Sequence, residues 1–180
     1  MTADQEAKPT MPFTTFESPF GKLTLVGDSA GHLHRLYFPG RAPALNVADR
    51  DPRTLAVATQ QLKEYFRGER TRFELELELA GTPFQRSVWG ALRTIPYGAT
   101  TSYGVLARQL EAQPRAVGAA VGSTPIPIIV PCHRVIGTDG SLTGYGGGLP
   151  RKRALLALEA GGGDREAFDA AWRERQLALL

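Results

Sequence analysis

Residues 125–136 read Pro-Ile-Pro-Ile-Ile-Val-Pro-Cys-His-Arg-Val-Ile and place the only cysteine of the chain, Cys132, directly before a histidine. A thiol is a useful nucleophile only as thiolate, and at its ordinary pKa of about 8.5 it needs a neighbouring base or positive charge to ionise at neutral pH. His133 could act as that base, and Arg134 could supply the charge. A lone cysteine is more often a small buried hydrophobic residue. These neighbours instead favour a cysteine used for chemistry.

The composition is that of an ordinary globular protein, and 180 residues suffice for one domain or two small ones. The first ten residues are polar and lack the apolar segment of a secretory signal, and no apolar run is long enough to span a bilayer. One cysteine can form neither an internal disulfide nor a cysteine-rich zinc site. We therefore expect a soluble, cytoplasmic protein without a membrane partner.

The net charge of +3 is unevenly distributed along the chain. Residues 1–80 carry a net charge of −1 and residues 161–180 also −1, whereas residues 81–160 carry +5. Between Glu111 and Glu159 the only acidic residue is Asp139. The charge around Cys132 therefore suits a polyanion such as nucleic acid, although five surplus charges could also merely keep a small domain soluble.

The first 80 residues are expected to form an antiparallel sheet with one helix. Three short runs rich in β-forming residues and separated by glycine-containing turns predict strands over residues 13–17, 22–26 and 32–38. Apolar residues at helical spacing over 54–66 predict a helix that stops before Gly68. Residues 72–79 alternate Phe or Leu with Glu, which predicts either a half-buried strand or an extended linker.

A second domain is expected to begin at Gly81-Thr82-Pro83, because Thr82 can cap a helix and proline suits the first helical position. Two short helices, over 102–110 and 115–121, then follow one another closely. They form a helix-turn-helix pattern, which as a bare pattern is common in small domains.

A glycine-rich loop, residues 137–148, follows the cysteine segment and could line a site or form a wing. It contains no G-x-x-x-x-G-K-[ST] sequence, so we do not predict a nucleotide-binding P-loop. The helix predicted over 150–159 begins with the basic triplet 151–153, which could be a solvated face or lie near a phosphate backbone.

Taken together, these motifs resemble the O6-alkylguanine-DNA alkyltransferase family, in order along residues 81–160. The Pro-Cys-His-Arg core is the most specific of them. The other matching blocks are Gly81-Thr82-Pro83-Phe84-Gln85, Ile95-Pro96-Tyr97-Gly98, Ser102-Tyr103-Gly104, Arg115-Ala116-Val117-Gly118, Thr143-Gly144-Tyr145 with Gly147-Gly148, and Lys152 with Leu155-Leu156 and Glu159.

The resemblance implies an α/β fold of the α+β kind, with a ribonuclease-H-like antiparallel sheet domain and a winged helix-turn-helix domain. Its expected divisions are a flexible N-terminus, the sheet domain, the DNA-binding and catalytic domain, and a C-terminal extension, over residues 1–12, 13–80, 81–160 and 161–180. In the extension, Phe168, Ala171 and Trp172 could belong to an amphipathic helix. The implied partner is double-stranded DNA containing O6-alkylguanine, bound through the minor groove by a monomer.

The implied activity is the irreversible, stoichiometric transfer of a methyl or larger alkyl group from O6 of guanine, and also from O4 of thymine, to Cys132. The expected catalytic groups are Cys132, His133 acting through a water, Glu159 holding the histidine, and Tyr103. Residues expected to contact DNA are Arg115, Tyr103, Ala116, Arg134 and Lys152. Those expected to line the pocket are Pro127, Val135, Tyr145, Gly146 and Gly147. No cofactor is expected, and no metal, since His32 and His34 have no third ligand beside them.

The sequence departs from the family pattern at three places. Ser123-Thr124 stands where an asparagine normally braces the cysteine segment, so we expect Thr124 to hold that segment with a shorter reach. The chain between Tyr103 and Arg115 is about two residues shorter than usual, which falls in the turn of the helix-turn-helix. Gly146 replaces a serine or alanine, which would enlarge the pocket.

Two other classes of protein remain open at this stage. A lesion-binding sensor would bind alkylated DNA without transfer, but such relatives lack the cysteine. A cysteine hydrolase or redox protein could use a Cys-His pair, although neither explains the basic segment or the helix-turn-helix.

Overall fold

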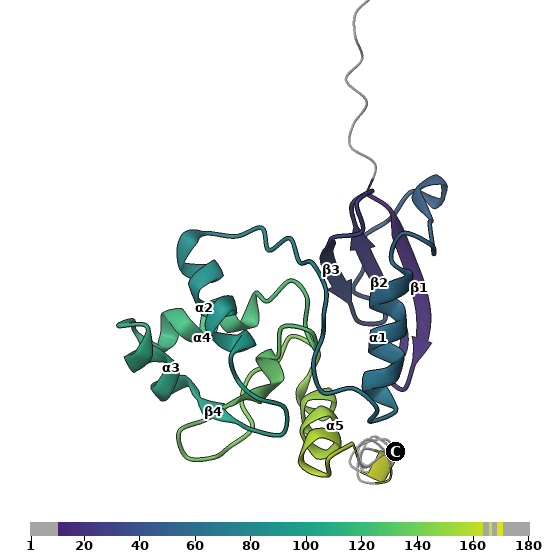
Figure 1. Ribbon diagram of the computed structural model, residues 1–180. Coiled ribbons are helices and arrows are strands. Elements are labelled where there is room, and N and C mark those ends of the chain that lie inside the picture. The colour runs from purple at the N-terminus through teal and green to yellow at the C-terminus, as the bar shows by residue number, and fades with distance from the viewer. Residues whose placement is uncertain (1–10, 164–165, 167–168, 171–180) are drawn as a thin grey trace, which may run out of the picture.

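The computed structural model describes residues 11–163, 166, 169 and 170, and over these residues the fold is of mixed α and β structure (Figure 1). A three-stranded antiparallel sheet and α1 form the N-terminal part, while α2 to α5 surround the cysteine segment in the C-terminal part. The fold class predicted from the sequence is confirmed. Residues 1–10 of the predicted N-terminal segment, and the proposed helix around Phe168, Ala171 and Trp172, lie outside the described residues.

The sheet consists of β1 (Phe13–Ser18), β2 (Gly21–Gly27) and β3 (Leu33–Tyr37) in that order. All three predicted strands are present. The turn between the first two is tight because Gly21 adopts φ 93°, a conformation that glycine takes without steric penalty. A short 3-10 helix, Val47–Asp49, then leads to α1 (Ala56–Phe66), whose apolar side chains pack on the sheet.

Residues 72–79 are an extended linker that touches the sheet at one point. Its Phe and Leu side chains are half-buried and its Glu side chains are exposed, as the alternation predicts. Leu33 of β3 donates its backbone N–H to Glu76 and accepts one from Glu78, but no continuous strand forms. The segment therefore runs beside β3 and then crosses to α2 (Figure 1).

The C-terminal part begins with α2 (Pro83–Arg93), whose start is fixed by a complete capping box. The Thr82 hydroxyl accepts from Gln85 N–H, and the Gln85 side chain in turn accepts from Thr82 N–H. The indole N–H of Trp89 donates to the carbonyl of Ala120 at 2.9 Å, which ties this helix to α4.

The predicted helix pair consists of α3 (Tyr103–Gln109) and α4 (Pro114–Gly122). Ser102 caps α3, and Glu111 in the intervening turn adopts φ 49°, the left-handed conformation. Two short parallel strands, β4 (Thr101–Ser102) and β5 (Val135–Ile136), join the start of α3 to the cysteine segment. The 3-10 turn η2 (Cys132–Arg134) directly precedes β5, and α5 (Leu149–Ala160) follows the glycine-rich loop.

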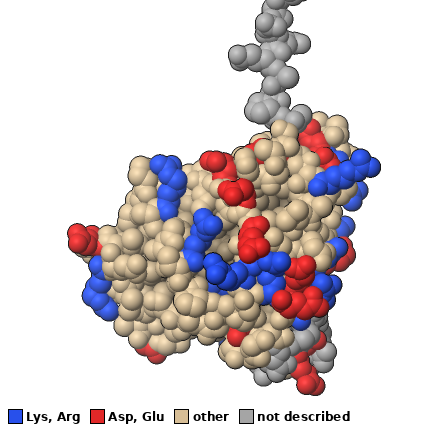
Figure 2. Space-filling model, viewed as in Figure 1, with Lys and Arg blue, Asp and Glu red and all other residues tan. Residues whose placement is uncertain are grey.

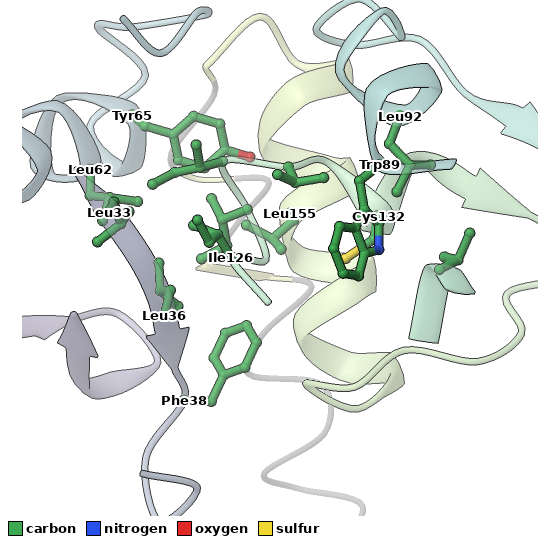
Figure 3. Packing of buried hydrophobic residues seen from close by; sticks show 14 of the residues in the cluster. Leu33, Leu36, Phe38, Leu62, Tyr65, Trp89, Leu92, Ile126, Cys132 and Leu155 are labelled. Carbon is green, nitrogen blue, oxygen red and sulfur yellow. The ribbon is translucent and has the colours of Figure 1, made fainter. Parts of the chain in front are cut away.

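One hydrophobic core joins the two parts of the chain (Figure 3). Side chains from β3, α1, α2, α5 and the cysteine segment belong to a single buried cluster. The backbone N–H of Leu36 in β3 donates to the carbonyl of Pro125 at 3.0 Å, across the boundary between the parts. The cysteine segment is thus anchored to the sheet as well as to its own helices. Within the described residues, every helix is too short or too polar to cross a membrane.

Candidate active site

Cys132 is the first residue of η2 and is only 4% exposed. Its backbone N–H donates to Val130 at 2.8 Å, which turns the chain sharply at the end of the apolar run. Burial raises the pKa of the thiol to about 11, while the Thr124 side chain and the charge of Lys152 act in the opposite direction. The thiol is therefore protonated at neutral pH, and its use as a nucleophile requires a base.

His133 lies fully buried beside it and is hydrogen-bonded to Glu159. Its Nε2 donates to Glu159 Oε1 at 2.8 Å, whereas Nδ1 is buried and has no hydrogen-bond partner among the described residues. Burial lowers the pKa of His133, more than the nearby carboxylate raises it. The imidazole is therefore neutral near pH 7, with Nδ1 as the nitrogen that can accept a proton.

Glu159, near the end of α5, is buried and receives donors from four residues. Arg134 donates to both carboxylate oxygens, at 2.8 and 2.9 Å, and the Tyr65 hydroxyl donates to Oε1 at 2.7 Å. The fourth is the backbone N–H of Gly98, at 3.3 Å. Burial alone would raise the pKa of Glu159, but the charges and hydrogen bonds of His133 and Arg134 outweigh it and lower the pKa to about 2. The carboxylate is therefore ionised at all physiological pH values.

A cavity of about 420 Å³ opens beside Cys132 and is shared between the two parts of the chain. Four of the five residues predicted to line the substrate pocket lie in the wall of this cavity: Pro127, Tyr145, Gly146 and Gly147. The fifth, Val135, is fully buried in β5 and does not reach the cavity. The opposite wall comes from β3 and the residues after it: Arg35, Leu36, Tyr37, Phe38 and Arg41.

The glycine-rich loop is held in the cavity wall by the end of β3 and the start of α5. Arg151 donates to the carbonyl of Gly147 at 2.7 Å, and its guanidinium lies 5.1 Å from the centre of the Phe38 ring. The ring of Tyr145 contacts Phe38 edge-on, with 6.0 Å between their centres. The Tyr145 hydroxyl is buried without a hydrogen-bond partner among the described residues, which is uncommon for a buried polar group.

Tyr103 lies at the start of α3, outside the residues that line this cavity. Its hydroxyl is 3.4 Å from the carbonyl oxygens of Thr143 and Gly144. Burial raises its pKa, and the charge of an ionised Cys132 would raise it further. Tyr103 therefore keeps its proton at neutral pH and can act as a hydrogen-bond donor or an acid.

Arg115 and Ala116 are both exposed in the first turn of α4, the second helix of the pair. Arg134 and Lys152, which were also predicted to contact DNA, are buried instead. The ammonium group of Lys152 donates to three backbone carbonyls, those of Val135, Thr143 and Gly144, at 2.5, 2.7 and 3.2 Å. Burial lowers its pKa to about 8. Arg134 and Lys152 are therefore buried groups that bind other parts of the protein and do not lie on its surface.

Ser123 and Thr124 directly follow α4 and hydrogen-bond its C-terminal carbonyls. The Ser123 hydroxyl donates to Ala120 at 2.9 Å, and the Thr124 hydroxyl donates to Val121 at 2.7 Å. The Thr124 side chain also acts to lower the pKa of the Cys132 thiol, although burial outweighs this effect. Just beyond, Ile128 is fully buried at φ 76°, a strained conformation for a β-branched residue that costs about 1–3 kcal/mol and persists only where packing enforces it.

A helix-turn-helix part that carries a buried Cys-His-Glu arrangement next to a cavity defines a DNA-binding protein with a reactive cysteine. Two family models match the chain: "6-O-methylguanine DNA methyltransferase, ribonuclease-like domain" over residues 11–79, and "6-O-methylguanine DNA methyltransferase, DNA binding domain" over residues 83–161. The chain therefore belongs to the 6-O-methylguanine DNA methyltransferase family.

Similar proteins of known name agree with this assignment. The methylated-DNA--protein-cysteine methyltransferase of Mycolicibacterium paratuberculosis is 53% identical over 150 residues, which cover 82% of this chain and 91% of that protein. The constitutive enzyme of Bacillus subtilis is 41% identical over 152 residues, covering 80% and 92%. The crystal structure of Mycobacterium tuberculosis OGT in complex with DNA matches with a TM-score of 0.80 and 49% identity, covering 87% of this chain and 98% of that one.

Some residues of the site were not found from the sequence. Tyr65, which binds Glu159, lies 94 positions away from it on α1, and the β3 wall of the cavity belongs to the other part of the chain. A tyrosine at a core position of a helix carries no local sign of a polar partner. Only the tertiary fold reveals these contacts.

Proposed function

We propose that this protein repairs alkylated DNA by transferring an alkyl group, methyl or larger, from O6 of guanine to the sulfur of Cys132, and likewise from O4 of thymine. The observation that carries the proposal is the single cysteine placed in a cavity wall directly beside the buried His133–Glu159 pair. Membership of a family named for this methyl transfer supports it.

The proposed reaction begins with loss of the thiol proton. His133 Nδ1 accepts it through a water, and Glu159 holds the Nε2–H tautomer that leaves Nδ1 free. The thiolate then attacks the alkyl carbon in line with the C–O6 bond. As the S–C bond forms, the C–O6 bond breaks and its electron pair stays on guanine. Tyr103, a protonated phenol, assists the departing base as hydrogen-bond donor.

The product is a thioether, which explains why each molecule would act once. A thioester has an electrophilic carbonyl that water can attack, whereas a thioether has none. The cysteine is therefore not regenerated, and the protein is consumed in proportion to the lesions it repairs. The activity needs no cofactor, since the thiol itself accepts the group.

For DNA recognition we propose that α4 enters the minor groove, with Ala116 against the backbone and Arg115 in the place of the extruded nucleotide. Their exposure in the first turn of α4 supports this role. Tyr103 is proposed to rotate the phosphate of the extruded nucleotide. The alkylated base would enter the cavity, with Tyr145 and the backbone of Gly146 and Gly147 around it.

Arg134 and Lys152 receive a different proposed role, because both are buried and fully engaged with protein groups. Arg134 keeps Glu159 ionised. Lys152 holds the glycine-rich loop against β5 through three carbonyls. They are positioning residues and not DNA contacts.

We further propose that residues 13–80 and 81–160 are two separate domains and that the protein acts as a monomer in the cytoplasm. The two matched family models meet between residues 79 and 83, which supports the division. The single cysteine, which fits a reducing compartment, supports the cytoplasm.

The test is to incubate the protein with a duplex containing one O6-methylguanine and to measure its intact mass. We expect one added methyl group per molecule, located on the peptide that contains Cys132. The Cys132→Ala variant should remain unmodified while still binding the duplex. A wild-type protein that binds the lesion without gaining mass would instead indicate a lesion sensor.

A further inference from the structure

A second cavity lies on the other side of the cysteine segment and has no part in the proposed reaction. It has a volume of about 710 Å³ and opens between the linker that leaves α1, at residues 71–73, and the end of α2, at residues 93–97. Its floor is formed by Ile129, Pro131 and Arg134. We call it the linker cleft. The cavity that contains Cys132 and the linker cleft thus flank the same loop without sharing a lining residue.

The charged groups that described residues contribute to the linker cleft are all positive. Arg72 and Arg93 stand on opposite sides of it, one on the linker and one on α2, and both are exposed. Neither guanidinium has a hydrogen bond or ion pair with any described residue. Arg134, at the floor, is 8% exposed and bound to Glu159. Figure 2 shows Lys and Arg atoms gathered over the middle of this face of the molecule, with Asp and Glu atoms at their border.

Among the described residues, no aspartate or glutamate lines the linker cleft itself. Unpaired guanidinium groups on two facing segments are an arrangement that binds phosphate, because each can present two parallel N–H donors to one phosphate group. On a surface that binds no ligand, exposed arginines usually extend into solvent or pair with a nearby carboxylate. Here both face a concave, acid-free surface.

The remaining lining suits the rest of a nucleotide. Phe73 and Tyr97 supply aromatic surface and Ile95 and Ile129 supply aliphatic surface. The volume lies within the range of about 300–1,000 Å³ that small-molecule sites occupy. Apolar walls with a few convergent polar groups are the general character of such sites. A base or sugar could pack on the walls while its phosphate groups bind the arginines.

We propose that the linker cleft binds a phosphate-bearing ligand of nucleotide size, held through Arg72 and Arg93. The ligand is either a free nucleotide or the backbone of a nucleic-acid strand that continues past the cavity of Cys132. In both cases the recognised chemistry is a phosphate group beside a planar or apolar body. The proposal does not depend on alkyl transfer.

The test is isothermal titration calorimetry of the full chain with three probes: inorganic pyrophosphate, adenosine diphosphate and a six-nucleotide single-stranded oligothymidylate. The diagnostic variant is the double substitution Arg72→Gln and Arg93→Gln. The matched control is Arg50→Gln with Arg53→Gln, which removes the same charge from exposed arginines outside the cleft. All these side chains are exposed, so thermal melting should show each variant folded as the wild type is.

We expect at least one phosphate probe to bind the wild type and the control equally, and to bind the cleft variant about tenfold or more weakly. Binding of adenosine diphosphate but not of the oligonucleotide would identify a free nucleotide as the ligand, and the reverse would identify a strand of nucleic acid. The proposal is overturned if no probe binds at millimolar concentration, or if the cleft variant and the control lose affinity alike. Since no alkylated DNA is present, the result is independent of the transfer reaction.

Discussion

Replacement of Glu159 by glutamine should weaken both the fold and the reaction. The substitution keeps the size of the side chain and removes its charge. It leaves the guanidinium of Arg134 buried without a counter-charge, because both of its contacts with an acid are to this carboxylate. It also removes the anion that stabilises a protonated His133.

The magnitude follows from the burial and from the pKa of the carboxyl. Breaking a buried ion pair by removing one partner costs about 3–5 kcal/mol. Independently, the fall of the Glu159 pKa from 4.5 to about 2 corresponds to about 3 kcal/mol of folding stability. Because the pKa is lower in the folded protein, this stability is fully present above pH 4.5 and is lost as the pH falls towards 2. The deficit of Glu159→Gln should therefore be largest near pH 7 and shrink below pH 4.5.

The measurement is urea unfolding of wild type and variant from pH 3.5 to 7, with Glu64→Gln as control. Glu64 forms an ion pair with Arg70 in which both side chains are about a quarter exposed, and a solvent-accessible pair of this kind contributes much less to stability than a buried one. The rate of reaction with free O6-benzylguanine should fall about a hundredfold or more in Glu159→Gln, the usual size of a general-base contribution. If both variants lose the same stability with the same pH dependence, the argument for a buried charged network is refuted. Should Glu159→Gln fail to fold, Glu159→Asp should show the same trends more weakly.

Three further predictions follow from individual contacts. Arg115→Ala should slow repair in duplex DNA by about tenfold to a hundredfold, because extruding a base costs a few kcal/mol. The reaction with free O6-benzylguanine should be unchanged. Equal losses in both assays would mean that another residue takes the place of the extruded base in the duplex. Gly147→Ala should destabilise the protein by about 1–3 kcal/mol in chemical denaturation, because the new Cβ would lie 2.6 Å from the Phe38 ring. Adding Phe38→Leu to this variant should recover part of the lost stability. Tyr65→Phe should lower the unfolding free energy by about 1.5–3 kcal/mol, since its hydroxyl donates to the ionised Glu159, and an unchanged value would show that the bond contributes nothing net.

Local sequence signals predicted the elements of this fold well. The Thr82-Pro83 pair places the start of α2 correctly, because capping depends on residues within one turn of each other. The alternation over 72–79 predicts which side chains are half-buried, since the side chains of any extended segment point alternately to opposite faces. It could not decide between strand and linker. That choice depends on whether β3 presents a free edge along its whole length, and only Leu33 pairs with the segment.

The cationic residues show where the sequence was insufficient. Within the basic triplet, Arg153 is exposed, Lys152 is fully buried and Arg151 packs on two aromatic rings. One period of a helix sends three successive side chains in three directions, so a basic run does not by itself define a basic surface. The hydrogen-bond partners of the buried Lys152 are backbone carbonyls. Every residue has such a carbonyl, so the amino-acid sequence does not reveal these partners.

The order Cys-His-Arg has a physical reason in the 3-10 turn that carries it. With three residues per turn, consecutive side chains leave the axis about 120° apart. The three side chains of one turn can therefore contact three different parts of the protein. Cys132 lines the cavity, while His133 and Arg134 both reach Glu159 from the other sides. A buried carboxylate that held His133 alone would have its pKa raised by desolvation and would tend to protonate. The arginine next in sequence prevents this, because its two hydrogen bonds keep the carboxylate charged inside the core. The nucleophile, its base and the cation that keeps the carboxylate ionised are therefore positioned by a single turn of backbone, and a change in that turn would disturb all three together.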